Sequence, residues 1–333
     1  MAPVYALDRF YLSLTLLVTV AYQLLGFAIA WIFQFDKITD FTGGSNFFLL
    51  ALLTLLIGNT FHARNIVASV LVMVWAVRIA GFLLFRVLKT GSDTRFDEIR
   101  SHFLKFLAFW IGQIIWVWTV SLPLTILNSP AISDVNNQGS NPAFGTSRDI
   151  VGIVLWALGF IIEATADIEK YRYKASKSSP KDMPMNKGLW AWSRHPPYFG
   201  EMMCWWGIWI LCLSPTTNGS LSSSAKAAQY GAIMSPIFTV LLLMFASGVP
   251  SAEKPQAKKF YLMAHGPDAP EERSNAWRQY QAYLKKTSIL IPLPPALYVR
   301  LPELVKRTVL LDFPMYRFDE EKDGAKAVEQ ASK

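Results

Sequence analysis

The stretch Phe10–Phe33 reads FYLSLTLLVTVAYQLLGFAIAWIF and contains no charged residue in 24 positions. A helix needs about 20 apolar residues to cross the hydrocarbon core of a bilayer. The stretch is about twice as long as the apolar core of a signal peptide, and only one cation, Arg9, precedes it. We therefore interpret it as a retained first membrane span.

Composition places the whole chain in the membrane class. Of its 333 residues, 52% are apolar and 17% are charged, whereas about 25% of residues are charged in an ordinary soluble domain. The formal net charge of +8 comes from basic residues that mostly flank apolar runs. A protein that binds nucleic acid would instead interleave cations with aromatic residues on a soluble face. The composition predicts an integral membrane protein and argues against a nucleic-acid partner.

Further apolar stretches predict the remaining spans. On the template of about 20 apolar residues per helix, the sequence predicts an all-α polytopic bundle of about seven spans. The predicted spans are residues 10–33, 47–61, 66–88, 103–127, 150–168, 199–213 and 230–249. The second and the sixth are short, so their ends are the least well defined.

The distribution of lysine and arginine predicts the orientation. With the N-terminus outside, the loops assigned to the cytoplasm hold twelve of these residues, the outside segments hold four, and the tail from Pro250 holds fourteen. Because cytoplasmic loops retain cations, we expect the N-terminus outside and the C-terminus in the cytoplasm. The glycosylation triplet Asn218-Gly219-Ser220 then lies on the non-cytoplasmic side.

The tail is predicted to lie outside the bilayer core. Residues 289–311 contain three prolines within four positions, which break any helix long enough to span. An interfacial segment fits them better. Residues 319–333 are polar and charged, and the composition predicts disorder there.

Residues 193–201, Ser-Arg-His-Pro-Pro-Tyr-Phe-Gly-Glu, combine ionisable groups with a helix start. Pro196 and Pro197 interrupt one helical pattern, and a new helix is expected near Tyr198. Its N–H groups, with Arg194 and His195 beside them, favour an anion such as phosphate. The alternative is a juxtamembrane anchor of arginine and interfacial aromatic side chains.

Two carboxylates lie near the inner end of the fifth predicted span. Glu163 and Asp167 are four residues apart and share one helical face, which Lys170 joins. Charges within a membrane need a partner or a function. Two interpretations stay open: an ion-pair ladder, or a polar pocket that opens to the cytoplasm.

The segment Gly188–Glu201, GLWAWSRHPPYFGE, resembles the GLWxxSRHPNYFGE segment of the steroid 5-alpha-reductase-like family (3-oxo-5-alpha-steroid 4-dehydrogenase C-terminal-like membrane proteins). The resemblance covers about residues 66–295, so we divide the chain into residues 1–65, 66–295 and 296–333. The sequence departs from the family segment at one position: the asparagine that precedes the tyrosine in the family is Pro197 here. Other matching positions are Trp75, Arg78, Arg86, the run 93–97, the run 163–167, the run 247–250, Glu253, Lys254, Tyr280, Tyr283 and the run 290–292.

The resemblance implies a seven-helix bundle that binds NADPH from the cytoplasmic side, in the endoplasmic reticulum. Hydride would reduce a carbon–carbon double bond conjugated to a carbonyl in a steroid, sterol, isoprenoid or other lipid. Carried over by motif, the expected cofactor ligands are Asp167, Arg194, His195, Tyr198 and Glu201, with Lys174 and Tyr283 as weaker candidates. The 2′-phosphate of NADPH would be bound by cations such as Arg95, Lys170, Arg172 and Lys174.

The proton donor of such a reaction is not identified by the motif. A buried phenol or a protonated carboxyl group can supply the proton. Tyr198 and Asp40 are the candidates, although Asp40 is also typical of a solvated loop acid. Trp110, Trp116, Trp205 and Trp206 could line a water-free substrate pocket, or simply pack in the bundle.

Two other functions stay open. Membrane methyltransferases of the isoprenylcysteine or phospholipid type also carry an Arg-His-Pro-x-Tyr segment, but they usually show an arginine and a glutamate pair downstream, where this chain has only Glu253. A non-catalytic lipid-binding or transport protein is the third possibility. The four histidines and two cysteines form no metal-ligand pattern.

Overall fold

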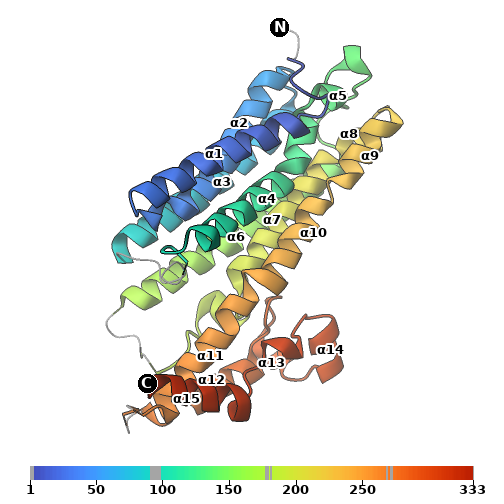
Figure 1. The fold of residues 1–333 in the computed structure, drawn as a ribbon. Coiled ribbons are helices and arrows are strands. Elements are labelled where there is room, and N and C mark those ends of the chain that lie inside the picture. Colours follow the sequence, from blue (N-terminus) through green and yellow to red (C-terminus); the bar gives the residue numbers. More distant parts are fainter. Residues whose placement is uncertain are drawn as a thin grey trace. The chain divides into compact units, whose positions relative to one another are not determined.

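The computed structural model describes residues 4–90, 99–176, 180, 182–267, 269–270 and 273–332. The chain forms two compact units. The first comprises Met1–Ala157 and Cys204–Thr239, and the second comprises Leu158–Met203 and Val240–Lys333. The described residues are helical apart from loops and two isolated bridges (Figure 1).

The helices divide between the units as follows. The first unit holds α1 (Leu12–Ile32), η1 (Asp36–Ile38), α2 (Thr39–Gly58), α3 (Ala63–Thr90), α4 (Phe103–Asn128), α5 (Pro130–Ser133), η3 (Val135–Asn137), α8 (Ser214–Asn218) and α9 (Ser223–Gly231). Three helices contribute residues to both units: α6 (Ser147–Ala175), α7 (Pro196–Cys212) and α10 (Met234–Leu241). The second unit holds η4 (Gly188–Ala191), η5 (Leu242–Ala246), α11 (Val249–His265), α12 (Ala276–Lys286), α13 (Pro295–Tyr298), α14 (Glu303–Thr308), η7 (Pro314–Tyr316), η8 (Glu320–Gly324) and α15 (Ala325–Ala331).

Six helical segments among the described residues are long and apolar enough to cross a membrane. They are Leu12–Ile32, Thr39–Gly58, Ala63–Lys89, Phe103–Ser133, Ser147–Ala175 and Ser223–His265. The chain is therefore an integral membrane protein with an all-helical fold. The sixth predicted span corresponds to α7, which has 17 residues and is not among the six. The count of seven stays a prediction, as does the orientation of the termini.

The second span begins earlier than its hydropathy suggests. The sequence predicts a start at residue 47, whereas α2 starts at Thr39. This prediction was wrong because the first two turns of α2 carry small and polar residues that are nonetheless buried, among them Thr42, Gly43, Gly44 and Asn46. A hydropathy window excludes such residues, yet membrane helices use them at close contacts.

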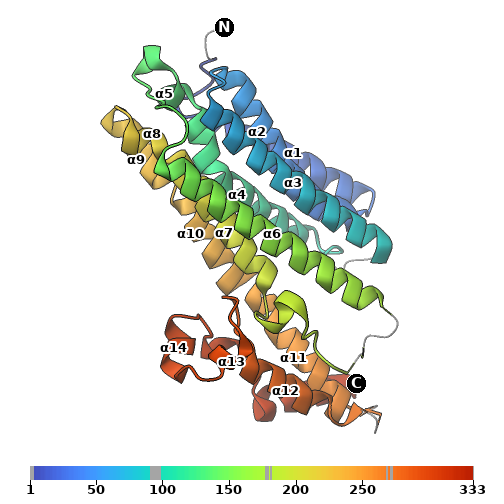
Figure 2. The ribbon, with the colours of Figure 1, turned by 180° about the vertical axis from the view of Figure 1, so that it is seen from behind.

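Glycines allow α2 to approach its neighbours in the first unit, where α1 to α4 lie side by side (Figures 1 and 2). A Cβ atom on Gly44 would lie 3.0 Å from the Ala80 side chain of α3. At Gly58 it would lie 2.3 Å from the carbonyl oxygen of Asn128 at the end of α4. Small residues at these positions bring the backbones together, which strengthens van der Waals packing where lipid removes the hydrophobic driving force.

Buried polar side chains in the first unit hydrogen-bond to one another. Gln113 Nε2 of α4 donates to Gln23 Oε1 of α1 at 2.8 Å, and Gln23 Nε2 donates to Asn46 Oδ1 of α2 at 3.0 Å. In the same unit, Arg64 of α3 and Asp149 of α6 form an ion pair at 2.7 Å, with both side chains 1% exposed. Pairing of this kind offsets the cost of placing polar groups in a low-dielectric interior.

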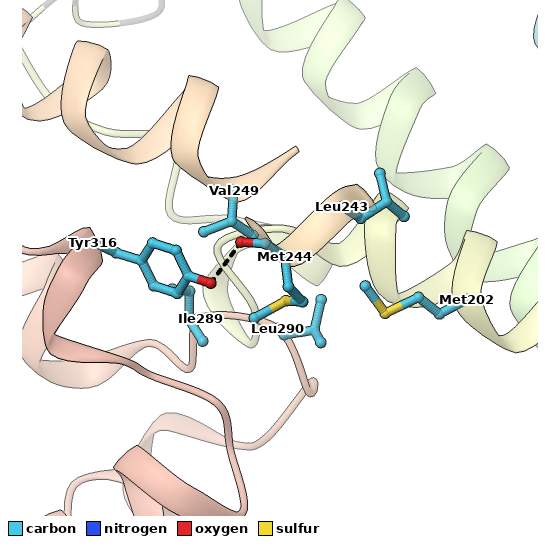
Figure 3. Close-up of a cluster of buried hydrophobic side chains, with 7 residues drawn as sticks. All are labelled: Met202, Leu243, Met244, Val249, Ile289, Leu290 and Tyr316. Atoms are coloured by element: carbon cyan, nitrogen blue, oxygen red, sulfur yellow. Dashed lines mark hydrogen bonds between the residues drawn. The ribbon is translucent and has the colours of Figure 1, made fainter. Parts of the chain in front are cut away.

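The second unit has a core built around a break between helices. Seven buried side chains form it: Met202, Leu243, Met244, Val249, Ile289, Leu290 and Tyr316 (Figure 3). Met244 lies in the π-helical turn η5, and the hydroxyl of Tyr316 donates to the Met244 carbonyl at 2.6 Å. At Gly248 a Cβ would lie 2.3 Å from the Leu243 carbonyl oxygen, so the bend into α11 requires glycine.

The C-terminal tail is ordered. The sequence predicts disorder for residues 319–333, but η8 and α15 occupy Glu320–Ala331, and Ala327 is buried. Lys258 Nζ of α11 donates to Gln330 Oε1 at 2.6 Å. The prediction was wrong because this polar helix is stabilised by contacts with α11 that composition does not show. Residues 289–311 contain only the short helices α13 and α14, as their prolines predict.

Candidate functional site

The turn between α6 and α7 is held by the segment that follows α12. The N–H of Arg194 donates to the Ser288 carbonyl at 2.8 Å, and the Ser193 hydroxyl donates to the Leu290 carbonyl at 2.7 Å. Pro196 occupies the first position of α7. A backbone N–H at that position would have no partner within the helix, so proline is tolerated there. The backbone of residues 193–195 is thus fixed from a part of the chain about 95 residues away.

A glycine fixes the start of the same turn. Gly188 has φ +57°, a left-handed conformation that favours glycine. A Cβ atom there would lie 2.0 Å from Glu169 Oε1. The carboxylate of Glu169 instead accepts the N–H of Leu189 at 3.0 Å. The first glycine of the motif is therefore required by the fold.

One carboxylate joins Arg194 to His195. Arg194 Nη1 lies 2.6 Å from Glu253 Oε2, and His195 Nε2 lies 2.7 Å from Glu253 Oε1. All three side chains are 7% exposed. Asp312 adds a second acid, with its Oδ1 3.0 Å from Arg194 Nη2, and Tyr298 donates its hydroxyl to Asp312 Oδ2 at 2.8 Å.

The protonation states follow from burial and from these partners. Burial lowers the pKa of Arg194, but the charges of Glu253 and Asp312 offset this and leave the pKa raised, so Arg194 is a cation. Burial, with the charges of Arg194 and Lys170, lowers the pKa of His195 below 6.5, although Glu253 acts in the opposite direction. His195 is therefore neutral at pH 7, and its Nε2–H donates to Glu253. Lys170 also acts electrostatically on His195 and Glu253, so the cluster holds two cations, Arg194 and Lys170, against two carboxylates.

A pocket of about 430 Å³ opens beside Arg194 within the second unit. This volume falls in the range of small-molecule sites, which are about 300–1,000 Å³. Its walls are aromatic, from Trp277, Tyr280, Tyr298, Tyr316 and Phe318, and it is also lined by Lys285, Lys306, Arg317, Glu303 and Glu320. Although Arg194 is buried, its Nε and Nη2 have no hydrogen-bond acceptor among the described residues. The contact of Nη2 with Asp312 is close but is not a hydrogen bond.

Four further predicted site residues join Arg194 around the turn: His195, Tyr198, Lys170 and Tyr283. The rings of Tyr198 and His195 stack at 5.2 Å with an angle of 7°. Lys170 Nζ lies 3.9 Å from the centre of the Trp190 ring. The hydroxyl of Tyr283 donates to the Trp190 carbonyl at 2.8 Å, and Tyr283 is 6% exposed. Tyr283 thus holds the backbone of the turn.

The other predicted residues lie in different surroundings. Asp167 on α6 and Glu201 on α7 are partly buried in the second unit, while Lys174 and Arg172 at the end of α6 are exposed. Asp40 belongs to the first unit, at the start of α2 rather than in a loop, with its Oδ2 3.9 Å from Arg86 Nη2. Arg95 lies outside the described residues.

The tryptophans proposed as a substrate wall take part in aromatic packing in the first unit. Trp205 and Trp116 both contact Phe47, with ring centroids at 5.3 and 5.0 Å. Trp110 is fully buried and contacts Phe27 at 6.3 Å. Trp206 contacts Trp209 at 5.6 Å. The four rings thus pack against other aromatic side chains, while the indole N–H groups of Trp110, Trp116 and Trp205 are buried without an acceptor among the described residues.

Sequence reasoning missed the two acids of the site. Glu253 matches the family resemblance, but it was not assigned to the site because it lies 58 residues after His195. Asp312 belongs to the tail that was interpreted as peripheral. A signal for it exists, since it is a lone acid between Val309-Leu310-Leu311 and Phe313. An isolated charge in an apolar run usually has a partner.

Comparison with known proteins identifies one family. Residues 26–265 match the model of the family described as "Protein of unknown function (DUF1295)". The chain matches none of the curated proteins and none of the solved structures with which it was compared. The match includes α2 to α11 and thus contains Arg194, His195 and Glu253, whereas Asp312 lies beyond it. Since the family model covers well over half of its residues, the chain belongs to the DUF1295 family.

Proposed function

We propose that this protein is a steroid 5-alpha-reductase-like enzyme that uses NADPH to reduce a carbon–carbon double bond conjugated to a carbonyl in a lipophilic substrate. The observation that carries the proposal is the buried guanidinium of Arg194, which lines a pocket and has two nitrogens without an acceptor. The motif around it supplies the resemblance to such reductases. By the same resemblance the membrane is that of the endoplasmic reticulum, and the substrate is a sterol, steroid, isoprenoid or other lipid enone.

The residues around the pocket fit a dinucleotide phosphate. Arg194 can donate its Nε and Nη2 hydrogens to a phosphate oxygen as a fork. Lys285, Lys306 and Arg317 add cations. Tyr280 and Tyr298 offer aromatic faces for a base, and the carboxylates of Glu253 and Asp312 can accept hydrogen bonds from ribose hydroxyls. NADPH, when bound, supplies the hydride.

The neighbouring side chains have distinct roles in this proposal. Glu253 holds Arg194 and His195 in one orientation. Tyr198, stacked on His195 at the start of α7, is the candidate that donates a proton to the developing enolate. Asp40 remains the other candidate donor. Lys170, Lys174, Asp167, Glu201 and Arg95 remain proposed cofactor ligands, and Pro197 replaces the amide that the family places there.

A specific observation favours a second candidate. Two carboxylates, those of Glu253 and Asp312, lie at the inner end of the pocket, and aromatic walls with nearby anions suit a cationic group. The sulfonium and the amino group of S-adenosylmethionine are such groups. A membrane methyltransferase is therefore the alternative, and a non-catalytic lipid-binding protein is the third.

Thermal unfolding of the purified protein with NADPH, NADH or S-adenosylmethionine separates these functions. A ligand at 100 times its Kd stabilises the folded state by about 2.7 kcal/mol. We expect NADPH to raise the unfolding temperature and S-adenosylmethionine to leave it unchanged. The reverse result supports the methyltransferase, and no response to any of the three supports the lipid binder.

Two variants test the site assignment. Arg194→Gln and Glu201→Gln should each weaken the stabilisation by NADPH. Arg148→Gln is the matched control, because Arg148 is an exposed cation of α6 that belongs to the first unit and does not line the pocket. It should respond as the parent protein does. Undiminished NADPH stabilisation in both Arg194→Gln and Glu201→Gln would remove the assignment.

A further inference from the structure

The C-terminal segment from Leu297 to Met315 exposes a patch of large apolar side chains. Its exposed members are Leu297, Val299, Leu304, Val309 and Met315. Leu304 is 72% exposed and Val309 is 62% exposed. Among the described residues after Phe245, all the exposed large apolar side chains belong to this segment. A patch confined to one segment indicates an interaction surface rather than the scatter of apolar residues that any surface carries.

Four buried side chains in this segment and directly after it anchor it to the second unit. Tyr298, Leu310, Asp312 and Tyr316 are all at least 92% buried. Between these anchors, α14 has no buried residue. Figures 1 and 2 both place α14 at the outer end of the segment, apart from α11 and α15. The segment therefore combines buried anchors with exposed apolar side chains that the described part of the chain does not cover.

Cations lie between the apolar side chains of this patch. Arg300, Lys306 and Arg307 fall within it, and Glu303 is the only acid in residues 297–311. Glu303 is paired with Arg307 at 3.0 Å and also with Arg317. Apolar side chains flanked by cations suit the boundary between acyl chains and anionic headgroups. A soluble partner would have to supply both an apolar groove and acids, whereas a bilayer is always near a protein with six candidate spans.

We propose that residues 297–315 dock on the surface of an anionic bilayer. Leu304 and Val309 enter the boundary between headgroups and acyl chains, and Arg300 and Arg307 lie against lipid phosphates. The docking surface does not depend on the NADPH chemistry. It does involve the segment that carries Tyr298 and Asp312 to Arg194, so the bilayer holds one wall of the pocket in place.

Cysteine labelling of the full chain in nanodiscs tests the proposal. The native cysteines, Cys204 and Cys212, are both buried, so an added cysteine can be labelled selectively. An environment-sensitive fluorophore is placed at Leu304→Cys, and at Ala282→Cys on the exposed side of α12 as the matched control. Nanodiscs of phosphatidylcholine and phosphatidylserine carry a spin label near the headgroup.

We expect the lipid spin label to quench the fluorophore at position 304 several-fold more than that at position 282. Quenching at position 304 should fall when phosphatidylserine is omitted, and it should fall again in the variant Arg300→Gln, Arg307→Gln. Arg278→Gln, which removes an exposed cation from α12, should leave it unchanged.

Two results would overturn the docking surface. Equal quenching at positions 304 and 282 would show that the patch faces water. Protection of position 304 from a water-soluble quencher, without quenching by lipid, would show that a protein covers it, either a second copy or another partner. Both substituted positions are exposed, so neither change is expected to prevent folding.

Discussion

At the residue scale, the site depends on a single carboxylate that serves two neighbours in sequence. Glu253 binds the guanidinium of Arg194 with one oxygen and the imidazole of His195 with the other. Both contacts are almost completely buried. Loss of the Glu253 carboxylate would therefore leave the buried guanidinium of Arg194 with Asp312 as its remaining acid. Breaking one side of a buried ion pair costs far more than breaking an exposed pair.

The substitution Glu253→Gln tests this dependence. We expect it to destabilise the protein by about 1–3 kcal/mol, because Arg194 and His195 each lose a charged, buried hydrogen-bond acceptor while Asp312 still opposes the guanidinium. Thermal or denaturant unfolding in detergent gives the measurement. The control is Glu303→Gln, whose side chain is 48% exposed beside Arg307 and whose loss should cost less than about 1 kcal/mol. Equal effects of the two substitutions would show that the Glu253 pairs are as weak as surface pairs.

His195 gives the site a dependence on pH. Burial lowers its pKa in the folded protein below 6.5, the value of an ordinary histidine. The unfolded chain then binds a proton at a higher pH than the folded protein does, so stability is full above pH 6.5 and falls as the pH drops through the folded-state pKa. In His195→Gln the fall in unfolding temperature over this acidic range should become smaller. An unchanged pH profile would place the responsible group elsewhere.

At the scale of elements, glycines allow some of the helices to approach each other closely. In the second unit, a Cβ atom at Gly200 of α7 would lie 2.5 Å from the Gly159 carbonyl oxygen and 2.8 Å from the Glu163 backbone nitrogen, both on α6. These are backbone atoms, which cannot rotate away. The last glycine of the motif therefore belongs to the helix contact, next to the carboxylate of Glu163.

We expect Gly200→Ala to destabilise the protein by about 1–3 kcal/mol, since the helices must separate to admit the methyl group. Gly112→Ala on α4 provides the control, because no atom lies within 4 Å of the added carbon. There the loss of backbone freedom in the unfolded chain should stabilise by about 0.4–1 kcal/mol. Unfolding temperatures that changed equally in the two variants would contradict the close contact.

Hydropathy alone predicts α1 and α4 to within two residues at either end, because their apolar runs are bounded by charged or polar residues. It fails at the start of α2, whose buried threonines and glycines carry no hydropathy signal. The motif predicts that Arg194 and His195 act together. It cannot predict Glu253 and Asp312 as their partners, since the contacts depend on how α11 and the tail fold back.

At the scale of the whole molecule, the distribution of lysine and arginine along the sequence predicts the membrane topology. Cations predict that the end of α6 faces the cytoplasm and that the loop before α9 does not. A membrane-impermeant thiol reagent applied to sealed microsomes tests this. Lys174→Cys should react at once, whereas Ser224→Cys should react only after detergent is added. Both positions are exposed, and the native cysteines are buried. The opposite pattern would invert the orientation.

The bond from Tyr316 to the Met244 carbonyl has a consequence for limited proteolysis. Cleavage by trypsin after the exposed Arg307 would separate residues 308–333 from the rest of the chain. That fragment also retains Asp312 against Arg194 and Gln330 against Lys258. We therefore expect the nicked protein to elute as one particle in size-exclusion chromatography and to resolve into two bands only on a denaturing gel.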